Sequence, residues 1–136
     1  MFIPTGSISA NALILGMALF IIKQLFADYI FQTTWMALGK DDQKTWFAPL
    51  LAHVSIHAMG TLIICLFLNA ALFWLALVDF VVHGTIDRSK SWIQARYKLT
   101  ATQGHFWWLL GTDQTLHHLT HLAFAIALAV TAVSST

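Results

Sequence analysis

Charged residues are scarce in this sequence. Only 10% of its 136 residues are Asp, Glu, Lys or Arg, whereas 58% are hydrophobic. Because soluble domains usually contain about 25% charged residues, this composition excludes an ordinary water-soluble domain and indicates a membrane protein. Neither a repeat nor a polar linker divides the chain, so we predict a single polytopic membrane domain over residues 1–136.

The sequence also lacks the marks of a secreted or disulfide-bonded protein. No basic residue precedes the first apolar stretch, and no small-residue cleavage site follows it. We therefore interpret this stretch as a membrane helix rather than a signal peptide. Cys65 is the single cysteine, which excludes an internal disulfide, and its apolar neighbours indicate a role in packing.

Long apolar stretches predict the fold. A bilayer core of about 30 Å is crossed by roughly 20 apolar residues in an α-helix. Four stretches approach that length, at about 8–30, 49–68, 70–87 and 114–133. We therefore predict an all-α integral membrane protein, a four-transmembrane-helix bundle with an interfacial segment between the third and fourth helices, in Arg88 to Thr112. Asn69 leaves room only for a tight turn between the second and third helices.

The placement of positive charge predicts the orientation. Apart from Lys23, every Lys and Arg lies in the loops Thr33–Ala48 and Arg88–Thr112. Because cytoplasmic loops of membrane proteins are enriched in these residues, we expect both loops to face the cytoplasm and both termini to face outward. Lys23 lies near the same end of the first helix, where we expect its ammonium group to snorkel outward.

Polar and ionisable residues inside the predicted helices follow one spacing. A charged side chain at mid-depth costs at least about 2.5–3.5 kcal/mol, so such residues usually face an interior or a cavity. Here they recur at every fourth position, which places them on one face of each helix. The sets are Gln24, Asp28 and Gln32; His53 and His57; Asp79, His83 and Asp87; and Asp113, His117 and His121. In the predicted orientation all four sets fall in the cytoplasmic halves, so we expect them to meet at one depth.

Imidazole together with carboxylate predicts a divalent metal site, for which zinc is our first choice and manganese or iron the alternatives. The candidate ligands outnumber those that a single four-coordinate ion needs, so we predict one or two ions. They are Asp28, His53, His57, Asp79, His83, Asp87, Asp113, His117 and His121. His105 and His118 fall off the polar face, and we do not expect them to be ligands. A purely structural hydrogen-bonding network between helices is the alternative.

Four short motifs resemble a known family. They are Ala27-Asp28 with Gln32, His53 with His57, His83 with Asp87 and Lys90, and Asp113-Gln114 with His117. On these residues the chain resembles a family of small bacterial inner-membrane proteins that is known as a domain of unknown function. The resemblance runs from about Lys23 to His121. It implies a multi-pass protein of the bacterial inner (cytoplasmic) membrane and no particular reaction.

The function that we predict is metal-dependent hydrolysis of a lipid or amphiphile at the cytoplasmic leaflet. A bound metal activates water and polarises a phosphoryl or carbonyl group, so no nucleophilic Ser or Cys is required. Asp28 or Asp87 is the candidate catalytic base, if it is not a ligand. The candidate substrate-binding residues are Arg88, Lys90, Gln32 and Gln114. Arg88 and Lys90 also fit a simple role in setting the topology.

The sequence is also compatible with other functions. Intramembrane Asp and His residues also form metal or proton pathways in transporters, although the predicted outer halves contain few polar residues. Haem ligation by a histidine pair is less compatible with so many carboxylates. A small membrane subunit whose polar cluster only locks the bundle is a further alternative. The expected partners are the lipid bilayer and an amphiphilic substrate rather than nucleic acid, and a homo-oligomer is left open.

Overall fold

A computed structural model describes residues 8–133 of the chain. Within that range every regular element is helical, which confirms the predicted all-α class. The elements are α1 (Ala10–Leu25), the π-helix η1 (Phe26–Ile30), α2 (Thr34–Gly39), α3 (Phe47–Leu68), the 3₁₀ helix η2 (Ala70–Leu72), α4 (Leu75–Arg96) and α5 (Gly104–Val133).

Short polar side chains set several helix boundaries. The hydroxyl of Ser9 accepts a hydrogen bond from the Ala12 N–H at 3.3 Å and caps α1, and Thr33 caps α2 in the same way. Such caps satisfy backbone donors that have no partner within the helix. Asn69 has an extended backbone that ends α3, and its side chain accepts from the Ala71 N–H at 3.1 Å. The chain reverses at Asn69 as predicted, but the connection also contains η2, so α4 begins at Leu75 rather than at residue 70.

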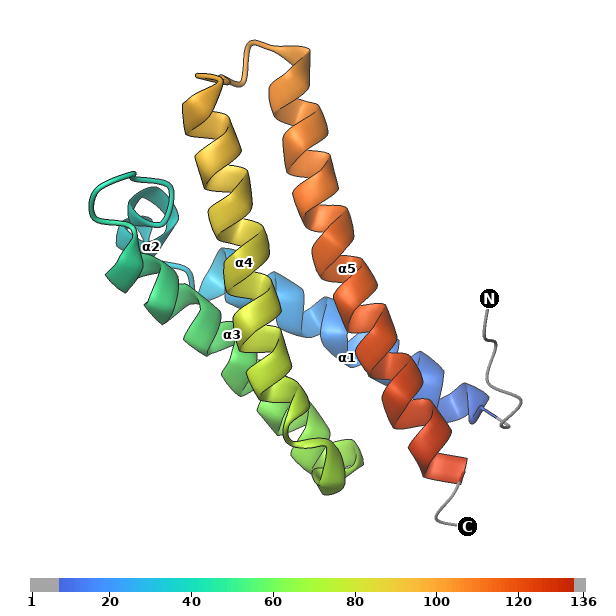
Figure 1. Cartoon of the computed structure of the whole chain (residues 1–136). Coiled ribbons are helices and arrows are strands. Elements are labelled where there is room, and N and C mark those ends of the chain that lie inside the picture. The colour runs from blue at the N-terminus through green and yellow to red at the C-terminus, as the bar shows by residue number, and fades with distance from the viewer. Residues whose placement is uncertain (1–7, 134–136) are drawn as a thin grey trace.

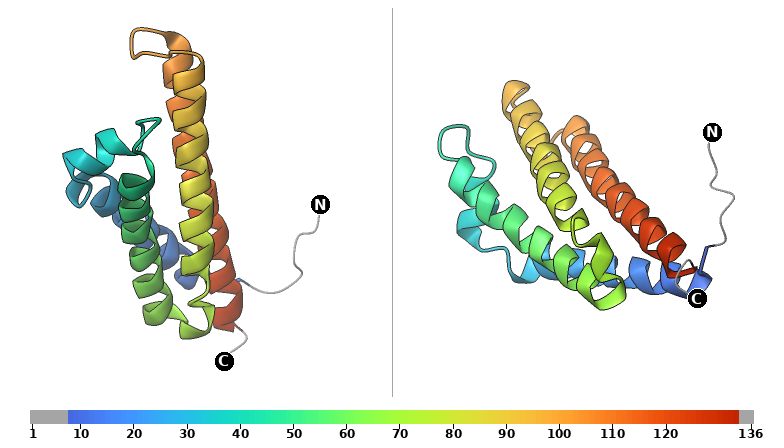
Figure 2. Two further views of the ribbon diagram at one scale, coloured as in Figure 1. Left: turned by 60° about the vertical axis from the view of Figure 1, so that its left-hand side comes forward. Right: turned by 60° about the horizontal axis from the view of Figure 1, so that its bottom comes forward.

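The four long helices form an open bundle. Helices α4 and α5 run antiparallel, α3 lies beside α4, and α1 crosses the others obliquely (Figures 1 and 2). The beginning of α1 lies against the last turns of α5, where the Ser9 N–H donates to the Ala129 carbonyl at 3.3 Å. Gly16 allows this close approach, since a Cβ there would lie 3.3 Å from that of Ala125. The structure thus brings the first and last helices together.

The distribution of apolar residues is that of a membrane protein. A buried core of seven residues fills one end of the bundle: Phe20, Ile64, Cys65, Leu75, Phe124, Ala125 and Leu128. Large apolar side chains such as Ile14, Phe67 and Leu77 are more than half exposed on the outside, whereas buried polar residues fill the rest of the interior. Soluble proteins rarely show this combination. Cys65 lies in the core, as its apolar surroundings predict.

Three helical segments are long and apolar enough to cross a membrane: Ala10–Ile30, Phe47–Leu68 and Ala70–Arg96. The first two correspond closely to the predicted spans 8–30 and 49–68, and the third extends the predicted span 70–87. The fourth predicted span, 114–133, lies within α5 and remains a prediction. The termini, whose outward orientation we predict, lie outside the described residues.

The connections between the helices differ from the prediction. The proposed interfacial segment in 88–112 is not a separate element, because α4 continues to Arg96 and α5 already begins at Gly104. The two ends project beyond α3 as a helical hairpin (Figure 2). The polar spacing explains the difference, since Ser91 continues the fourfold repeat beyond Asp87 and is buried. A short helix, α2, lies instead in the first loop.

The loop after α2 is held by an aspartate. Asp42 Oδ1 accepts hydrogen bonds from the backbone N–H groups of Thr45 and Lys44, both at 2.7 Å. The backbone donor of Thr45, with that of Lys44, stabilises the carboxylate and lowers the pKa of Asp42 below its ordinary value. This turn leads directly into α3 and fixes the position of the first loop above the bundle interior.

Candidate metal centre

The polar faces of the four long helical segments meet in the interior. Eight of the predicted ligands fall into three groups that share His83, with one potential ligand atom per residue and all such atoms within 4.8 Å of one another in each group. We name them the Asp28 group (Asp28, His53, His57 and His83), the Asp87 group (His83, Asp87 and His117) and the Asp79 group (Asp79, His83 and His121). Each group can hold a metal ion by its composition.

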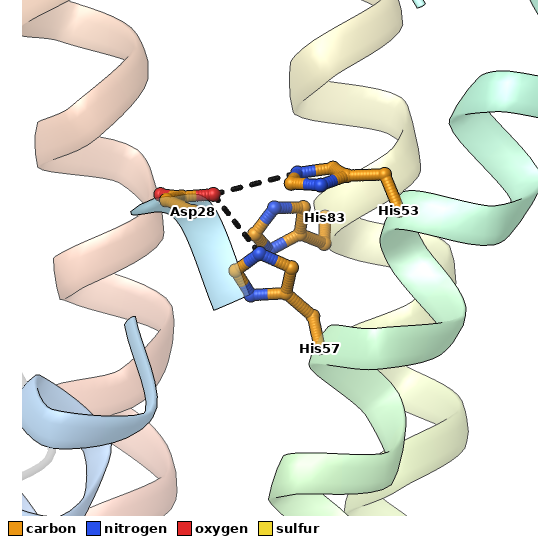
Figure 3. Close-up of side chains that lie close together, drawn as sticks. All are labelled: Asp28, His53, His57 and His83. Atoms are coloured by element: carbon orange, nitrogen blue, oxygen red, sulfur yellow. Dashed lines mark hydrogen bonds and ion pairs between the residues drawn. The ribbon is translucent and has the colours of Figure 1, made fainter. Parts of the chain in front are cut away.

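The Asp28 group contains three imidazoles and one carboxylate (Figure 3). Asp28 Oδ1 lies 3.0 Å from His57 Nε2 and 3.4 Å from His53 Nε2. The His83 ring lies close by, with its centroid 3.7 Å from that of His57. In a tetrahedral zinc site with bonds of 2.0–2.1 Å, neighbouring ligand atoms are separated by about 3.4 Å, so these distances fit such an ion.

Asp28 is carried by the π-helix η1, where the helical turn is locally widened. Gln24, one turn earlier, donates from Nε2 to Asp28 Oδ2 at 2.5 Å. Gln32, one turn later, donates to the Asp28 backbone carbonyl at 2.9 Å. The polar residues predicted in the first helix therefore support the position of Asp28 rather than forming a separate site.

The Asp87 group continues the cluster toward α5. Asp87 Oδ1 lies 3.5 Å from His117 Nε2, and Asp87 Oδ2 lies 3.4 Å from His53 Nε2. Because His53 faces both Asp28 and Asp87, the Asp28 and Asp87 groups form one continuous cluster. Asp113 is the only predicted ligand outside the three groups: its backbone carbonyl contacts His117 Nδ1 at 2.9 Å, and its carboxylate lies 4.0 Å away. Asp113 thus contacts His117 at Nδ1, while Nε2 of the same ring faces Asp87.

Lys23 contradicts the prediction that it snorkels outward. Its residue exposure is only 8%, and its Nζ lies 2.6 Å from Asp79 Oδ2, 2.9 Å from His121 Nε2 and 3.1 Å from Thr61 Oγ1. The expectation was wrong because snorkelling is favoured only when no partner is available inside. Here a carboxylate, an imidazole and a hydroxyl converge on the ammonium group within the bundle.

Sequence reasoning missed several residues of the cluster. Lys40 extends from the end of α2, and its Nζ lies 2.9 Å from Asp87 Oδ2 and 3.1 Å from His53 Nε2. Its position in a charged loop gave no sign of this contact. Thr61 and Ser91 are both buried and both continue the fourfold spacing, so the same spacing identifies them when hydroxyl residues are included with ionisable ones.

A polar cavity of about 220 Å³ opens onto the Asp28 and Asp87 groups. Three of the four predicted substrate-binding residues line it, namely Gln32, Lys90 and Gln114. Lys90 is held there by Asp41, whose Oδ2 lies 3.1 Å from the ammonium nitrogen. Arg88 is elsewhere: its guanidinium lies 4.3 Å from the Trp46 ring and lines an apolar cavity between α3 and α4. The structure therefore separates Arg88 from the proposed site.

The buried imidazoles also leave atoms without hydrogen bonds. Nδ1 is buried and unpartnered in His53, His57 and His83, and so is Nδ1 of His121. In His53, His57 and His121 it is Nε2 that faces an aspartate, so these Nδ1 atoms are not the atoms that would hold an ion there. Nε2 of His117 is also buried without a hydrogen bond and lies 3.5 Å from Asp87 Oδ1, where a bound ion would satisfy it. His105 and His118, which we did not expect to be ligands, are both exposed. The residues present therefore fit a divalent metal ion bound in the interior.

Residues 16–136 match a protein family described as "Protein of unknown function (DUF3307)". The chain belongs to this family. The match covers most of the sequence and confirms the resemblance inferred from its motifs. No curated protein and no solved structure matches this DUF3307 protein significantly.

Proposed function

We propose that this protein is a metal-dependent hydrolase that acts on a lipid or amphiphile at the cytoplasmic leaflet of a bacterial inner membrane. The observation that carries the proposal is the Asp28 group, in which η1, α3 and α4 place three imidazoles and a carboxylate within 4.8 Å inside an apolar bundle. Burying this many polar groups costs folding free energy unless they are hydrogen-bonded, paired with opposite charges or coordinated to a metal ion. The adjoining cavity gives a polar headgroup access to the cluster.

Zinc is the metal that we propose, with manganese or iron as alternatives for this mixture of imidazole and carboxylate. Such an ion supplies Lewis acidity and a water molecule that is more readily deprotonated. Asp28, His53, His57 and His83 would hold it, with Asp87 and His117 completing the coordination or holding a second ion.

The remaining residues have roles that follow from their positions. Asp87 borders the cavity and contacts two histidines, so it can accept a proton at its carboxylate as general base. Asp28 is the alternative base if it does not hold the metal. Lys90, Gln32 and Gln114 face the cavity and can bind the polar part of a substrate. The hydrocarbon part would stay beside the apolar outer surface of the bundle.

We also propose the topology that the charge distribution predicts: four spans including 114–133, both loops in the cytoplasm and both termini outside. The cavity opens on the side of the first loop, whose Lys40 and Asp41 line it. A substrate would therefore enter from the cytoplasmic leaflet. Labelling of single cysteines placed in the loop after α2 and in the turn at Asn69, in a Cys65→Ala background, tests this orientation.

Elemental analysis of detergent-purified protein tests the metal site. We expect wild type to retain near-stoichiometric zinc, manganese or iron, and His57→Asn to lose it. His118→Asn is the matched control, because His118 lies on α5 next to His117 in sequence but is exposed. A metal-free wild type with unchanged stability in chelator would contradict the proposal. If metal is present, turnover of phospholipids, lipid phosphates and esters is then screened, and no turnover would reject the hydrolase.

A metal or proton carrier is the second candidate, because the buried polar chain extends beyond the cluster to Asp79 and Thr61. The apolar core that includes Phe20, Cys65 and Phe124 closes the interior beyond these residues. This closure weighs against a continuous path in a single chain. Uptake of metal into sealed liposomes would favour the carrier. Haem is less compatible, because the His83 ring centroid lies only 3.7 Å and 3.8 Å from those of His57 and His117.

A further inference from the structure

The Asp79 group has a cation of its own. Lys23 Nζ lies 2.6 Å from Asp79 Oδ2, 2.9 Å from His121 Nε2 and 3.1 Å from Thr61 Oγ1. An ammonium group has three donors and no acceptor, so these three partners can satisfy it completely. Thr61 in turn donates to Asp79 Oδ2 at 2.5 Å, which ties the group together. Lys23 therefore occupies the position that a metal ion would take between the same carboxylate and imidazole.

A metal ion and this ammonium group exclude each other. Two cations sharing the same carboxylate would lie only a few ångströms apart, and their repulsion is poorly screened away from water. Asp79 is the single carboxylate of the group, so it can balance only one positive charge. Metal binding at the Asp79 group would therefore require the Lys23 side chain to leave.

The surroundings of Lys23 prevent that departure. The lysine stem lies against Gly60, where a Cβ would come within 2.8 Å of Lys23 Cγ. The ammonium nitrogen also lies 5.9 Å from the Phe20 ring, in the apolar core. The side-chain exposure of Lys23 is 5%, against 14% for Lys40, which reaches its cluster from a loop and lines the open cavity. Lys23 also lines a cavity, of about 410 Å³, but its other lining residues are almost all apolar and offer the ammonium group no charged partner. Lys40 can therefore withdraw among polar groups, whereas withdrawal of Lys23 would place its charge in apolar surroundings.

We propose that Lys23 is the permanent resident cation of the Asp79 group, so that metal binding is confined to the Asp28 and Asp87 groups. It follows that replacing the amine opens an additional metal site at Asp79 and His121, with His83 in reach. This inference rests on the proposed function for the metal at the Asp28 group, and it assigns Asp79 and His121 to a different role from the one that their spacing predicts.

Zinc titration of three purified full-length chains tests the inference: wild type, Lys23→Met and Lys23→Met/Asp79→Asn. Methionine keeps most of the volume of the lysine stem and removes its charge. We expect Lys23→Met to bind one more equivalent of zinc than wild type and to gain thermal stability as zinc is added. The double variant, which also lacks the carboxylate, should return to the wild-type stoichiometry. Circular dichroism and gel filtration verify that each chain is folded.

Three results would overturn the inference. They are a folded Lys23→Met chain without the extra equivalent, the extra equivalent persisting in the double variant, and a double variant that binds one equivalent fewer than wild type. If Lys23→Met alone does not fold, the double variant is compared with wild type. We then expect the two chains to bind the same number of zinc equivalents, and a lower number in the double variant would overturn the inference. A wild type without zinc would reject the proposed function, whereas Lys23→Met binding one equivalent in that case would still support the role of Lys23.

Discussion

The Asp28 group and the Asp79 group are built from the same kinds of residue and share His83, yet their surroundings differ. The single carboxylate of the Asp79 group contacts a buried lysine from α1. The carboxylate of the Asp28 group is held by Gln24 and faces two histidines, with no lysine in hydrogen-bond contact among the described residues. The comparison shows that an Asp/His stripe does not define a metal site by itself, because a cation from a neighbouring helix can take the same place.

The two lysines extend this comparison. Lys23 lies on a helix long and apolar enough to span a membrane and borders an apolar cavity, whereas Lys40 is in a loop beside a polar cavity. Both contact an aspartate and a histidine. We infer that Lys23 has a permanent electrostatic role and that Lys40 occupies its place only until metal binds.

The largest expected effect comes from breaking the buried ion pair. Asp79→Asn leaves the Lys23 ammonium without its counter-charge, and removing one partner of a buried pair typically costs about 3–5 kcal/mol of folding free energy. Removing both charges, in Lys23→Met/Asp79→Asn, should cost much less. Unfolding of each variant in detergent, followed by tryptophan fluorescence, measures the difference. With Lys23→Met measured alone as well, a double-variant loss equal to the sum of the two single losses would mean that the pair is not coupled in the folded protein.

A smaller effect is expected from the space beside Lys23. The Cβ of Gly60→Ala would lie 2.8 Å from Lys23 Cγ, so the lysine stem must shift, and overpacking of this kind costs about 1–3 kcal/mol. Gly84→Ala is the matched control in α4, because its Cβ would make an ordinary contact with Val54 at 3.5 Å. That variant should be neutral or more stable by up to about 1 kcal/mol through helix propensity. The same unfolding assay compares them, and equal stability of the two variants would show that the lysine stem is not held against Gly60.

The smallest expected effect is the change in zinc affinity when Lys40 is replaced. Lys40→Met removes a cation that competes for Asp87 and His53, so zinc should bind more tightly, by about tenfold or about 1.4 kcal/mol. The stoichiometry should stay at the wild-type value, in contrast to Lys23→Met. Competition with a chromophoric chelator measures the affinity. Weaker binding in Lys40→Met would instead make Lys40 a supporting residue of the site.

Much of the fold and part of the site could be predicted from local sequence. Apolar stretches identify the all-helical membrane class, and the fourfold spacing identifies one polar face per helix because residues four apart share a face. The continuation of α4 to Arg96 was missed because charged and aromatic residues were interpreted as an interfacial loop. Ser91 indicates this continuation in the sequence, because it lies four residues after Asp87 and therefore on the same face of the helix, where it is buried.

The sequence by itself determined one polar face for each long helix, since helical periodicity depends only on neighbours along the chain. It could not determine how these faces pair. The partners of Lys23 lie 38, 56 and 98 residues away, on α3, α4 and α5. Only the packing of those helices around α1 brings Thr61, Asp79 and His121 to one point and turns the ammonium group inward. Tertiary structure thus decided which of two similar clusters carries its own cation and which has a composition that can hold a metal without one.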